Sequence, residues 1–361
     1  MGAGSMPAGA ATCDQTTTLP RPIELGVSGG NINSFGGSGK HRFCFSGTLG
    51  SLVQDSSSNQ FILSNNHVLA DVNKAKKGQP IVQPGLIDTA TPCTKTPADA
   101  VATFSRTVKI KFGNAKNTID AAIAAVKTGD VSADILNIGS IASTVVSTPT
   151  VGLAVQKMGR STCLTSATIS AVGVNGTINY SQTGGKKLAK FVNQIMIDGP
   201  PPPNNFGGPG DSGSLIVTQD ICPQAVGLLF AGSADQTQTI VNPISAVLSG
   251  LNVTMVGSCT AAAASDTAAA SDTSSADVLA ASQGMSKEAV ASAAAVRDRH
   301  EDELMSIPGA VGTGVGAGDQ PDQPAIIVYV KKMTPQAQAA APKDVEGLPV
   351  KIIENGGFVA Y

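Results

Sequence analysis

Short apolar runs, separated by turn residues, recur along most of this 361-residue chain. Val, Ile, Leu, Phe and Ala dominate the runs, whereas Gly, Pro, Asn and Ser stand between them. The runs cover residues 43–53, 60–64, 108–112, 118–126, 151–157, 168–180, 194–198, 214–218 and 225–231. Short strands at such a spacing are typical of β-barrels and β-sandwiches. The pattern therefore predicts an all-β fold as far as about residue 256.

The pattern changes near residue 260. Residues 260–283 consist mostly of Ala, Ser, Asp and Thr, and this low-complexity composition predicts a linker. The expected elements beyond it are a helix over 286–306, strands over 310–315, 325–331 and 349–354, and a short helix over 334–341. A mixture of this kind predicts a small α+β module at the end of the chain.

Composition narrows the class of partner. Lys and Arg number 24 against 26 Asp and Glu, the formal net charge is -2, and no run of five like charges occurs. This balance argues against nucleic acid or an acidic membrane surface as the partner. No apolar run approaches the roughly 20 residues that cross a bilayer. Proteins, peptides or small molecules are therefore the expected partners, with neither nucleic acid nor a membrane among them.

Six cysteines are scattered through the chain, at Cys13, Cys44, Cys93, Cys163, Cys222 and Cys259. No two of them form a Cys-x-x-Cys pair, so their spacing does not predict a zinc site. Three disulfides and a set of buried thiols are both open interpretations. Residues 1–20 lack a basic region followed by an apolar core, so we expect no secretory signal and favour the cytoplasm over secretion.

The stretch 207–214 reads Gly-Gly-Pro-Gly-Asp-Ser-Gly-Ser and sets Ser212 among glycines. Gly210 and Gly213 can adopt backbone conformations that are closed to other residues, so the turn can direct successive N–H groups into one small space. That space is a candidate oxyanion hole. A serine is inert at neutral pH without a base. The stretch is therefore an ordinary loop unless a histidine and a carboxylate lie elsewhere in the chain.

Two residues can complete such a site. His67 directly follows a predicted strand, which makes it a better general-base candidate than His41, in a loop, or His300, in a charged run. Asp120 opens the most apolar of the early runs. A carboxylate in that position needs a hydrogen-bond partner, and an imidazole N–H is a suitable one.

Together the three residues form a pattern. Ser-Asn-Asn-His-Val-Leu-Ala around His67, Ile-Asp-Ala-Ala-Ile around Asp120 and Gly-Asp-Ser-Gly-Ser around Ser212 resemble the motifs of chymotrypsin/trypsin-like serine peptidases. More narrowly, the chain is similar to bacterial trypsin-like peptidases related to plant narrow-leaf proteins. The resemblance covers about residues 20–256, and three motifs in the right order are a much stronger signal than one.

The resemblance implies two six-stranded antiparallel β-barrels packed face to face, with an active site in the cleft between them. The expected divisions are a flexible N-terminus at 1–19, barrel 1 at 20–145, barrel 2 at 146–259, a linker at 260–283 and a small α+β module at 284–361. The implied activity is that of a serine endopeptidase. Its mechanism requires no metal and no cofactor.

Each site residue then has an implied role. Ser212 attacks the scissile carbonyl, His67 takes and returns the proton, and Asp120 fixes the imidazole tautomer. The N–H groups of Gly210 and Ser212 stabilise the oxyanion. The implied substrate-binding residues are Phe206, Phe230, Ala231 and Gly232.

Two positions depart from the family pattern. One bears on substrate specificity and the other on the residue that supports Asp120. Phe206 stands six residues before Ser212, where the family's specificity residue lies. No carboxylate is therefore available there for a basic side chain, and trypsin-like specificity is not expected. Phe230 replaces the family's usual serine, which leaves the support of Asp120 open.

Two further departures concern activation and cross-linking. In the digestive enzymes, the aspartate that matches Asp211 pairs with an amino terminus freed by cleavage. No comparable activation site is evident in this sequence. We expect Lys157 or Arg160 to supply the charge instead. Val68 follows His67, so the disulfide that flanks the histidine in digestive members is absent.

The competing hypothesis is a binding or scaffold protein that keeps the barrels but hydrolyses nothing. Phe206, Phe230 or the proline run 200–203 would block its cleft. The C-terminal module carries no catalytic cluster in the sequence. We expect residues 284–361 to recruit a partner protein, form a homo-oligomer or restrain the protease.

Overall fold

The structure is a computed structural model that describes residues 15–36, 43–91, 93–127, 129–181, 187–260, 285–320 and 322–361. Cys13, His41, most of the expected N-terminal segment (residues 1–19) and nearly all of the expected linker 260–283 lie outside these residues. Strands dominate the described chain, as the sequence predicts. Within it, no helix is both long enough and apolar enough to cross a membrane.

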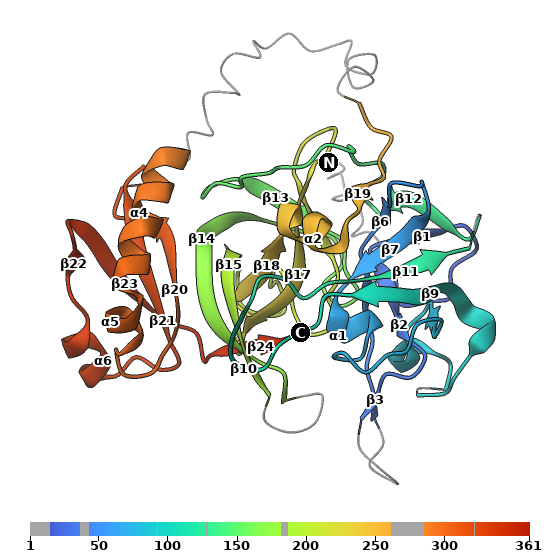
Figure 1. Cartoon of the computed structure of the whole chain (residues 1–361), viewed down its shortest axis with the longest axis horizontal. Helices are drawn as coiled ribbons and strands as arrows, with labels where there is room; N and C mark the ends of the chain where they lie inside the picture. Colours follow the sequence, from blue (N-terminus) through green and yellow to red (C-terminus); the bar gives the residue numbers. More distant parts are fainter. Residues whose placement is uncertain are drawn as a thin grey trace, which may run out of the picture.

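Six antiparallel strands form the first barrel (Figure 1). In pairing order they are β7 (Gln60–Ser64), β11 (Ala122–Val126), β9 (Ala100–Thr107), β8 (Pro80–Val82), β2 (Val27–Asn31) and a bent strand made of β5 (Gly47–Leu49) and β6 (Ser51–Gln54). Only Gly50 separates β5 from β6. Because β5 pairs with β2 and β6 pairs with β7, the bent strand closes the ring.

The second barrel is also a ring of six antiparallel strands. In order they are β13 (Ala154–Lys157), β14 (Thr165–Asn179), β15 (Leu188–Asp198), β18 (Gln238–Pro243), β17 (Ala225–Ser233) and β16 (Leu215–Thr218). The pairing of β14 with β15 and of β13 with β16 closes it. The chymotrypsin-like double barrel implied by the sequence motifs is therefore confirmed.

Short elements complete this region of the chain. They are the pair β1 (Ile23–Leu25) and β12 (Val131–Ile135), the hairpin β3 (Phe35–Gly36) and β4 (Phe43–Cys44), β10 (Gly113–Asn117) beside β15, β19 (Thr254–Met255) beside β6, the helices α1 (Asn66–Leu69) and α2 (Ile244–Leu251), and the short 3-10 helices η2 (Leu86–Asp88) and η3 (Pro97–Asp99).

The strand expected over 108–112 is wrong. Those residues are irregular, and the residues that follow them, Gly113–Asn117, form strand β10 instead. Side-chain amides explain the difference, because Asn73 and Asn117 bond the backbone of Ile110 and Lys111 in place of a neighbouring strand. Side-chain hydrogen bonds of this kind compete with sheet pairing.

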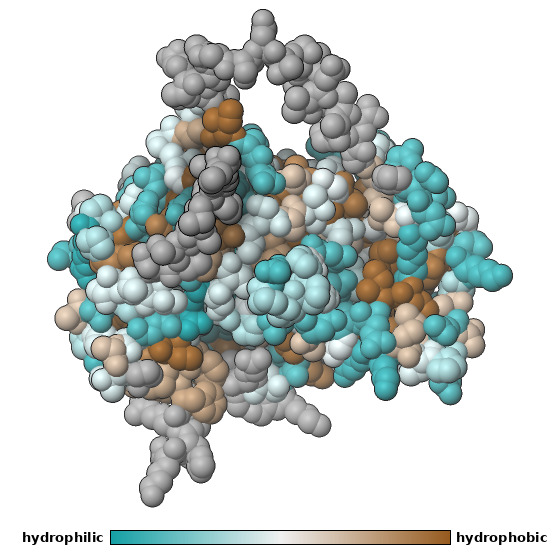
Figure 2. Space-filling model, turned by 180° about the vertical axis from the view of Figure 1, so that it is seen from behind, coloured by the Kyte–Doolittle hydropathy of each residue, from teal (hydrophilic) through white to brown (hydrophobic). Residues whose placement is uncertain are grey.

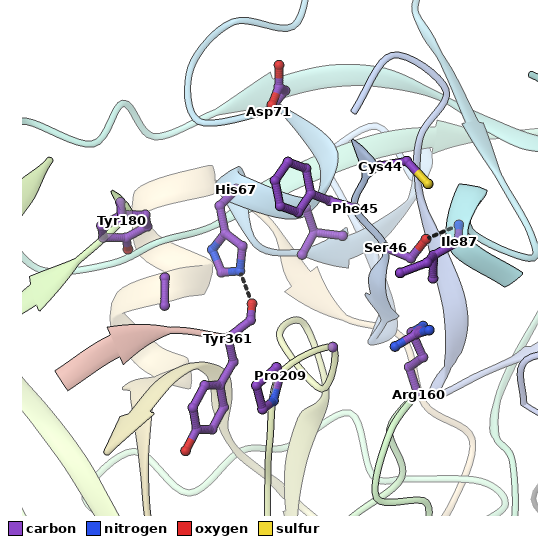
Figure 3. A pocket seen from close by; sticks show the side chains of 13 residues that line it. Cys44, Phe45, Ser46, His67, Asp71, Ile87, Arg160, Tyr180, Pro209 and Tyr361 are labelled. Atoms are coloured by element: carbon purple, nitrogen blue, oxygen red, sulfur yellow. Dashed lines mark hydrogen bonds between the residues drawn. The ribbon is translucent and has the colours of Figure 1, made fainter. Parts of the chain in front are cut away.

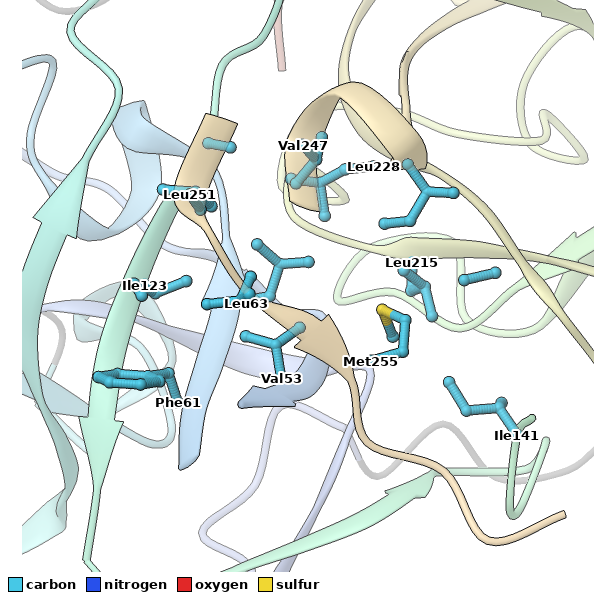
Figure 4. Packing of buried hydrophobic residues seen from close by; sticks show 14 of the residues in the cluster. Val53, Phe61, Leu63, Ile123, Ile141, Leu215, Leu228, Val247, Leu251 and Met255 are labelled. Carbon is cyan, nitrogen blue, oxygen red and sulfur yellow. The ribbon is translucent and has the colours of Figure 1, made fainter. Parts of the chain in front are cut away.

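One apolar core joins the two barrels (Figure 4). Leu63 and Ile123 come from the first barrel, Leu215 and Leu228 from the second, and Val247 from α2, and all five are buried. Because the inner ends of both barrels share these side chains, the barrels are held face to face.

The C-terminal module packs against the second barrel, and its last strand pairs with β17 of that barrel (Figure 1). Its elements are α4 (Lys287–Arg299), α5 (Glu301–Met305), β20 (Ala310–Ala317), β21 (Pro324–Val330), α6 (Pro335–Ala340), β22 (Asp344–Val345), β23 (Leu348–Glu354) and β24 (Phe358–Ala360). Strand β20 pairs with β14, so the sheet of the module continues the sheet of the barrel. The expected helix over 286–306 is divided at His300 into α4 and α5.

The surface seen from behind shows apolar patches separated by hydrophilic side chains (Figure 2). In the described chain, the large apolar side chains that remain exposed are Phe43, Ile87, Leu164, Leu188 and Ile221. Single exposed apolar residues are normal on soluble proteins and identify no docking face.

The five cysteines within the described ranges are all disulfide-bonded. Cys44 is bonded to Cys93 and Cys222 to Cys259, with Cα atoms 5.3 Å and 5.6 Å apart. Cys163 is also disulfide-bonded. The Cys222–Cys259 bond joins the turn between β16 and β17 to the segment after β19.

Replacement of Cys222 and Cys259 by alanine should lower the free energy of unfolding by about 2–4 kcal/mol, because the bond restricts the unfolded chain over a separation of 37 residues. Urea unfolding of the double variant beside the wild type measures this loss. As a control, both proteins are also unfolded in the presence of reductant, where neither has the Cys222–Cys259 bond and the difference between them should disappear. Equal urea midpoints for the two oxidised proteins would contradict the expectation.

Candidate functional site

His67 lies in α1, the single helical turn that follows β7. Its Nδ1 lies 2.6 Å from Oδ2 of Asp120, and its backbone N–H donates to Oδ1 of the same carboxylate over 3.3 Å. Asp120 precedes β11 and is fully buried. The antiparallel pairing of β7 with β11 brings the two segments side by side.

Tyr180 supports Asp120 from the second barrel. Its hydroxyl donates to Oδ2 of Asp120 over 2.7 Å, and its ring meets the His67 ring edge to face with centroids 6.0 Å apart. Burial, reinforced by the Asp120 charge, raises the pKa of the Tyr180 hydroxyl well above its usual range. The hydroxyl therefore remains a proton donor to the carboxylate.

Sequence reasoning misses Tyr180. It ends the apolar run 168–180, far from the three motifs, and only the need of a buried tyrosine hydroxyl for a partner could have drawn attention to it. Backbone groups of Asp120 are held as well, since its N–H donates to Oδ1 of Asn242 and its carbonyl accepts from Asn65. The support left open by Phe230 thus comes from Tyr180.

Ser212 lies in a tight turn pressed between the barrels. Its carbonyl accepts from the Thr48 N–H over 2.8 Å. Gly213 has φ +97° and lies against Thr48, and a Cβ there would stand 2.2 Å from the Thr48 carbonyl oxygen. Gly210 has φ +101°, and a Cβ there would stand 2.4 Å from Oγ of Ser161. Both positions therefore require glycine.

The main-chain oxygen of Tyr361 contacts both His67, as Figure 3 shows, and Ser212. The Ser212 hydroxyl donates to this oxygen over 2.6 Å, and Nε2 of His67 lies 2.9 Å from it. The structure thus brings His67, Asp120 and Ser212 together. It also places one residue of the C-terminal module, Tyr361, in direct contact with His67 and Ser212.

Asp211 is buried beside Lys157. Their charged atoms are 3.8 Å apart and both side chains are inaccessible to solvent. The Asp211 carboxylate accepts from the N–H groups of Gly208 and Ser161 and from the Thr162 hydroxyl. Burial lowers the pKa of Lys157, and the Asp211 charge opposes that shift.

Arg160, the other candidate partner of Asp211, points elsewhere. Its guanidinium forms a two-point pair with Asp88, over 2.6 Å and 2.7 Å. Of the two cations proposed from the sequence, Lys157 is therefore the one beside Asp211. The positive charge beside Asp211 is therefore the buried ammonium group of Lys157.

The expected substrate-binding residues lie around Tyr361. Ala231 and Gly232 belong to β17 and pair with β24, and the Phe230 carbonyl accepts from the Tyr361 N–H over 3.2 Å. Phe206 is buried in the same apolar cluster as Tyr361. All four expected residues therefore lie close to β24 or to Tyr361.

A cavity of about 290 Å³ lies beside Tyr361 and His67, and both residues line it (Figure 3). Phe45, His67, Ile87 and Arg160 are among its lining residues. Cys44 also lines the cavity. The residue after His67 is Val68, so the disulfide partner of Cys44 is Cys93 and not a cysteine beside the histidine. No cluster of three or more His, Cys, Asp or Glu side chains suited to a metal occurs in the described ranges.

The comparisons with known proteins give structural matches only. No family model matches the sequence, and no curated protein matches it. A glutamic acid specific serine protease matches with a TM-score of 0.43 and 17% identity over 65% of this chain and 100% of the other. Nocardiopsis protease has a TM-score of 0.42 and 16% identity over 64% and 98%, and Cellulomonas bogoriensis chymotrypsin a TM-score of 0.38 and 18% identity over 63% and 98%. The two closed barrels support the fold independently of these low scores.

Replacement of Lys157 by methionine should lower the free energy of unfolding by about 3–5 kcal/mol, because Asp211 would remain buried without its counter-charge. Arg160→Ala is the matched variant, and its cost should be smaller because the Arg160–Asp88 pair is partly exposed. Urea unfolding measures both. A larger loss of stability for Arg160→Ala than for Lys157→Met would contradict the assignment of Lys157 as the counter-charge of Asp211.

Proposed function

We propose that this protein is a serine endopeptidase acting on protein or peptide substrates. The observation that carries the proposal is that Ser212 and His67 both reach the main-chain oxygen of Tyr361, over 2.6 Å and 2.9 Å. A serine hydroxyl and an imidazole that both contact the oxygen of one main-chain group are close to the place where a scissile peptide would bind for this pair to act on it.

In the proposed reaction, Oγ of Ser212 bonds to the carbonyl carbon of the scissile peptide while His67 takes its proton. His67 then gives that proton to the leaving amine as the carbon–nitrogen bond breaks. Water, deprotonated by His67, then attacks the carbonyl carbon of the acyl-enzyme. The bond from that carbon to Oγ breaks, the acid product leaves, and His67 returns the proton to Ser212. Asp120 holds the imidazole tautomer in which Nε2 can accept the serine proton, and the 2.6 Å contact at Nδ1 supports this role.

The N–H groups of Gly210 and Ser212 are the proposed donors to the oxyanion. The positive φ of Gly210 supports this role, because successive N–H groups can converge in such a turn. Asp211, anchored by Lys157, would hold the turn in place. The mechanism requires neither a metal nor a cofactor.

We further propose three properties of the chain. They are a kinship with bacterial trypsin-like peptidases related to plant narrow-leaf proteins, the division of the chain at residues 20, 146, 260 and 284, and a partner or homo-oligomer contact through residues 284–361. Disulfides persist mainly in oxidising compartments, so the bonds Cys44–Cys93 and Cys222–Cys259 favour secretion over the cytoplasm.

The alternative is a protease-fold binding or scaffold protein without hydrolytic activity. One observation favours it, namely that β24 lies in the cleft beside Ser212. In this hypothesis the module would assemble the protein with partners. Chemical labelling of Ser212 separates the two functions.

A fluorophosphonate probe should label Ser212, and Ser212→Ala should abolish labelling. His67→Ala should slow hydrolysis of an unfolded protein substrate by about 10⁴-fold or more, because the serine would lose its base. Ser214→Ala is the matched serine control and should keep the label. Failure of labelling even after deletion of residues 358–361 would support the binding-protein alternative.

Tyr180→Phe should lower kcat by about 10- to 100-fold, because the Asp120 carboxylate would lose a hydrogen bond at the atom that holds His67. As a positioning residue, Tyr180 should also affect the pH profile of kcat, whereas KM should change little. Phe112→Leu, which alters a ring packed on Tyr180 without touching Asp120, is the control. An unchanged kcat and pH profile would remove Tyr180 from the support of Asp120.

A further inference from the structure

The last residues of the chain lie in the cleft as an added strand. β24 pairs antiparallel with β17, where Ala360 faces Ala231 and Val359 faces Gly232. Its other edge pairs in parallel with the end of β14. An extended peptide that adds to a sheet is bound by its backbone, while pockets select its side chains. β24 therefore occupies the cleft in the manner of a bound peptide.

The register of this strand relative to Ser212 has a chemical meaning. Tyr361 donates its N–H to the Phe230 carbonyl, and its own main-chain oxygen contacts Ser212 and His67. In a substrate, the residue in this position contributes the carbonyl group that is attacked, and it is called P1. The cavity of about 290 Å³ lies beyond that carbonyl, where the residues after the scissile bond would lie.

The side chain of Tyr361 fills a fitted pocket beside β17. It is 8% exposed and belongs to an apolar cluster with Phe206 and Leu229. Its hydroxyl donates to the carbonyls of Ser233 and Gln238, over 3.1 Å and 3.3 Å. Burial raises the pKa of this hydroxyl, so it stays protonated and remains a donor.

Glycine at position 232 makes room for the ring. A Cβ on Gly232 would stand 2.1 Å from the hydroxyl oxygen of Tyr361 and 2.2 Å from its Cζ. The floor of the pocket offers carbonyl oxygens, which accept a hydroxyl and give no counter-charge for a carboxylate. Apolar walls with acceptors at the far end suit a tyrosine side chain.

We propose that the pocket formed by Phe206, Gly232 and Ser233 selects an aromatic P1 residue, with tyrosine preferred, and that residues 358–361 occupy it as an internal competitor of substrate. This inference rests on the proposed function for its cleavage step. Occupation of the pocket by the tail is a separate property that binding measures. Cleavage requires the tail to leave, because its main-chain oxygen contacts both Ser212 and His67.

The tail is well placed to compete. Asn355 donates to the side chain of Gln238, Gly357 accepts from the Ala234 N–H, and β20 joins the module to β14. The tail is therefore tethered close to its pocket, which raises its effective concentration there far above that of a free peptide. A substrate must displace it or encounter the fraction of molecules in which it has left.

Tyr361→Ala in the full chain tests the internal competitor. Loss of a buried aromatic side chain should weaken the tail, so that fluorophosphonate labelling of Ser212 becomes about 10- to 100-fold faster than in the wild type. Tyr361→Phe is the matched control. It keeps the ring and loses only the hydroxyl contacts, so its labelling rate should lie between the other two.

Peptide binding tests the pocket without any need for hydrolysis. A fluorescein-labelled peptide Asn-Gly-Gly-Phe-Val-Ala-Tyr, which copies residues 355–361, should bind Tyr361→Ala, and the same peptide ending in Lys or Glu should bind at least about tenfold more weakly. Gly232→Ala should abolish the preference for Tyr, with a thermal melt to establish that the variant is folded. Cleavage of a peptide library by Tyr361→Ala should show Tyr and Phe at P1.

The outcomes separate the inference from the proposed function. Equal labelling rates in wild type and Tyr361→Ala, together with no preference for the Tyr peptide, would overturn the inference while labelling itself upheld the peptidase. Labelling with cleavage mainly after Lys, Glu or Ala would also overturn it. Selective binding of the Tyr peptide without labelling of Ser212 in any variant would uphold the pocket and overturn the peptidase.

Discussion

The buried carboxylate of Asp120 is the constraint on which the arrangement of the site depends. It lies in the first barrel, yet its hydrogen-bond donors come from both barrels, His67 from the first and Tyr180 from the second. A buried charge without such donors would cost several kcal/mol. The need to satisfy this one group therefore orients the imidazole and also ties the two barrels at the point where the cleft forms.

A second buried carboxylate, Asp211, has a comparable role beneath the Ser212 turn. Lys157 supplies a positive charge from within the same barrel, and backbone N–H groups satisfy the carboxylate oxygens. Within the described residues, the turn is thereby held by a side-chain cation of the same barrel and by backbone donors. In this chain the restraint on the cleft lies elsewhere, in the strand β24 that comes from the C-terminal module.

The module and the cleft consequently form one structural unit. The β20–β14 pairing attaches the module to the second barrel, and β24 then returns to β17, which carries Phe230, Ala231 and Gly232. A single strand of the barrel thus lines the pocket and accepts the tail. The contacts that place Tyr361 beside Ser212 and those that hold its side chain therefore come from the same strand of the barrel and the turn that follows it.

The amino-acid sequence by itself determined the all-β class, the order of the three motifs and the mixed composition of the module, because strand periodicity and glycine-rich turns are local properties. It singled out His67, Asp120 and Ser212 on that basis. Only the tertiary structure decided that Tyr180 supports Asp120, that Lys157 rather than Arg160 lies beside Asp211, and that Tyr361 meets Ser212. These pairs are distant in the chain, and their contacts arise from barrel closure and strand pairing, which leave no local pattern of residues.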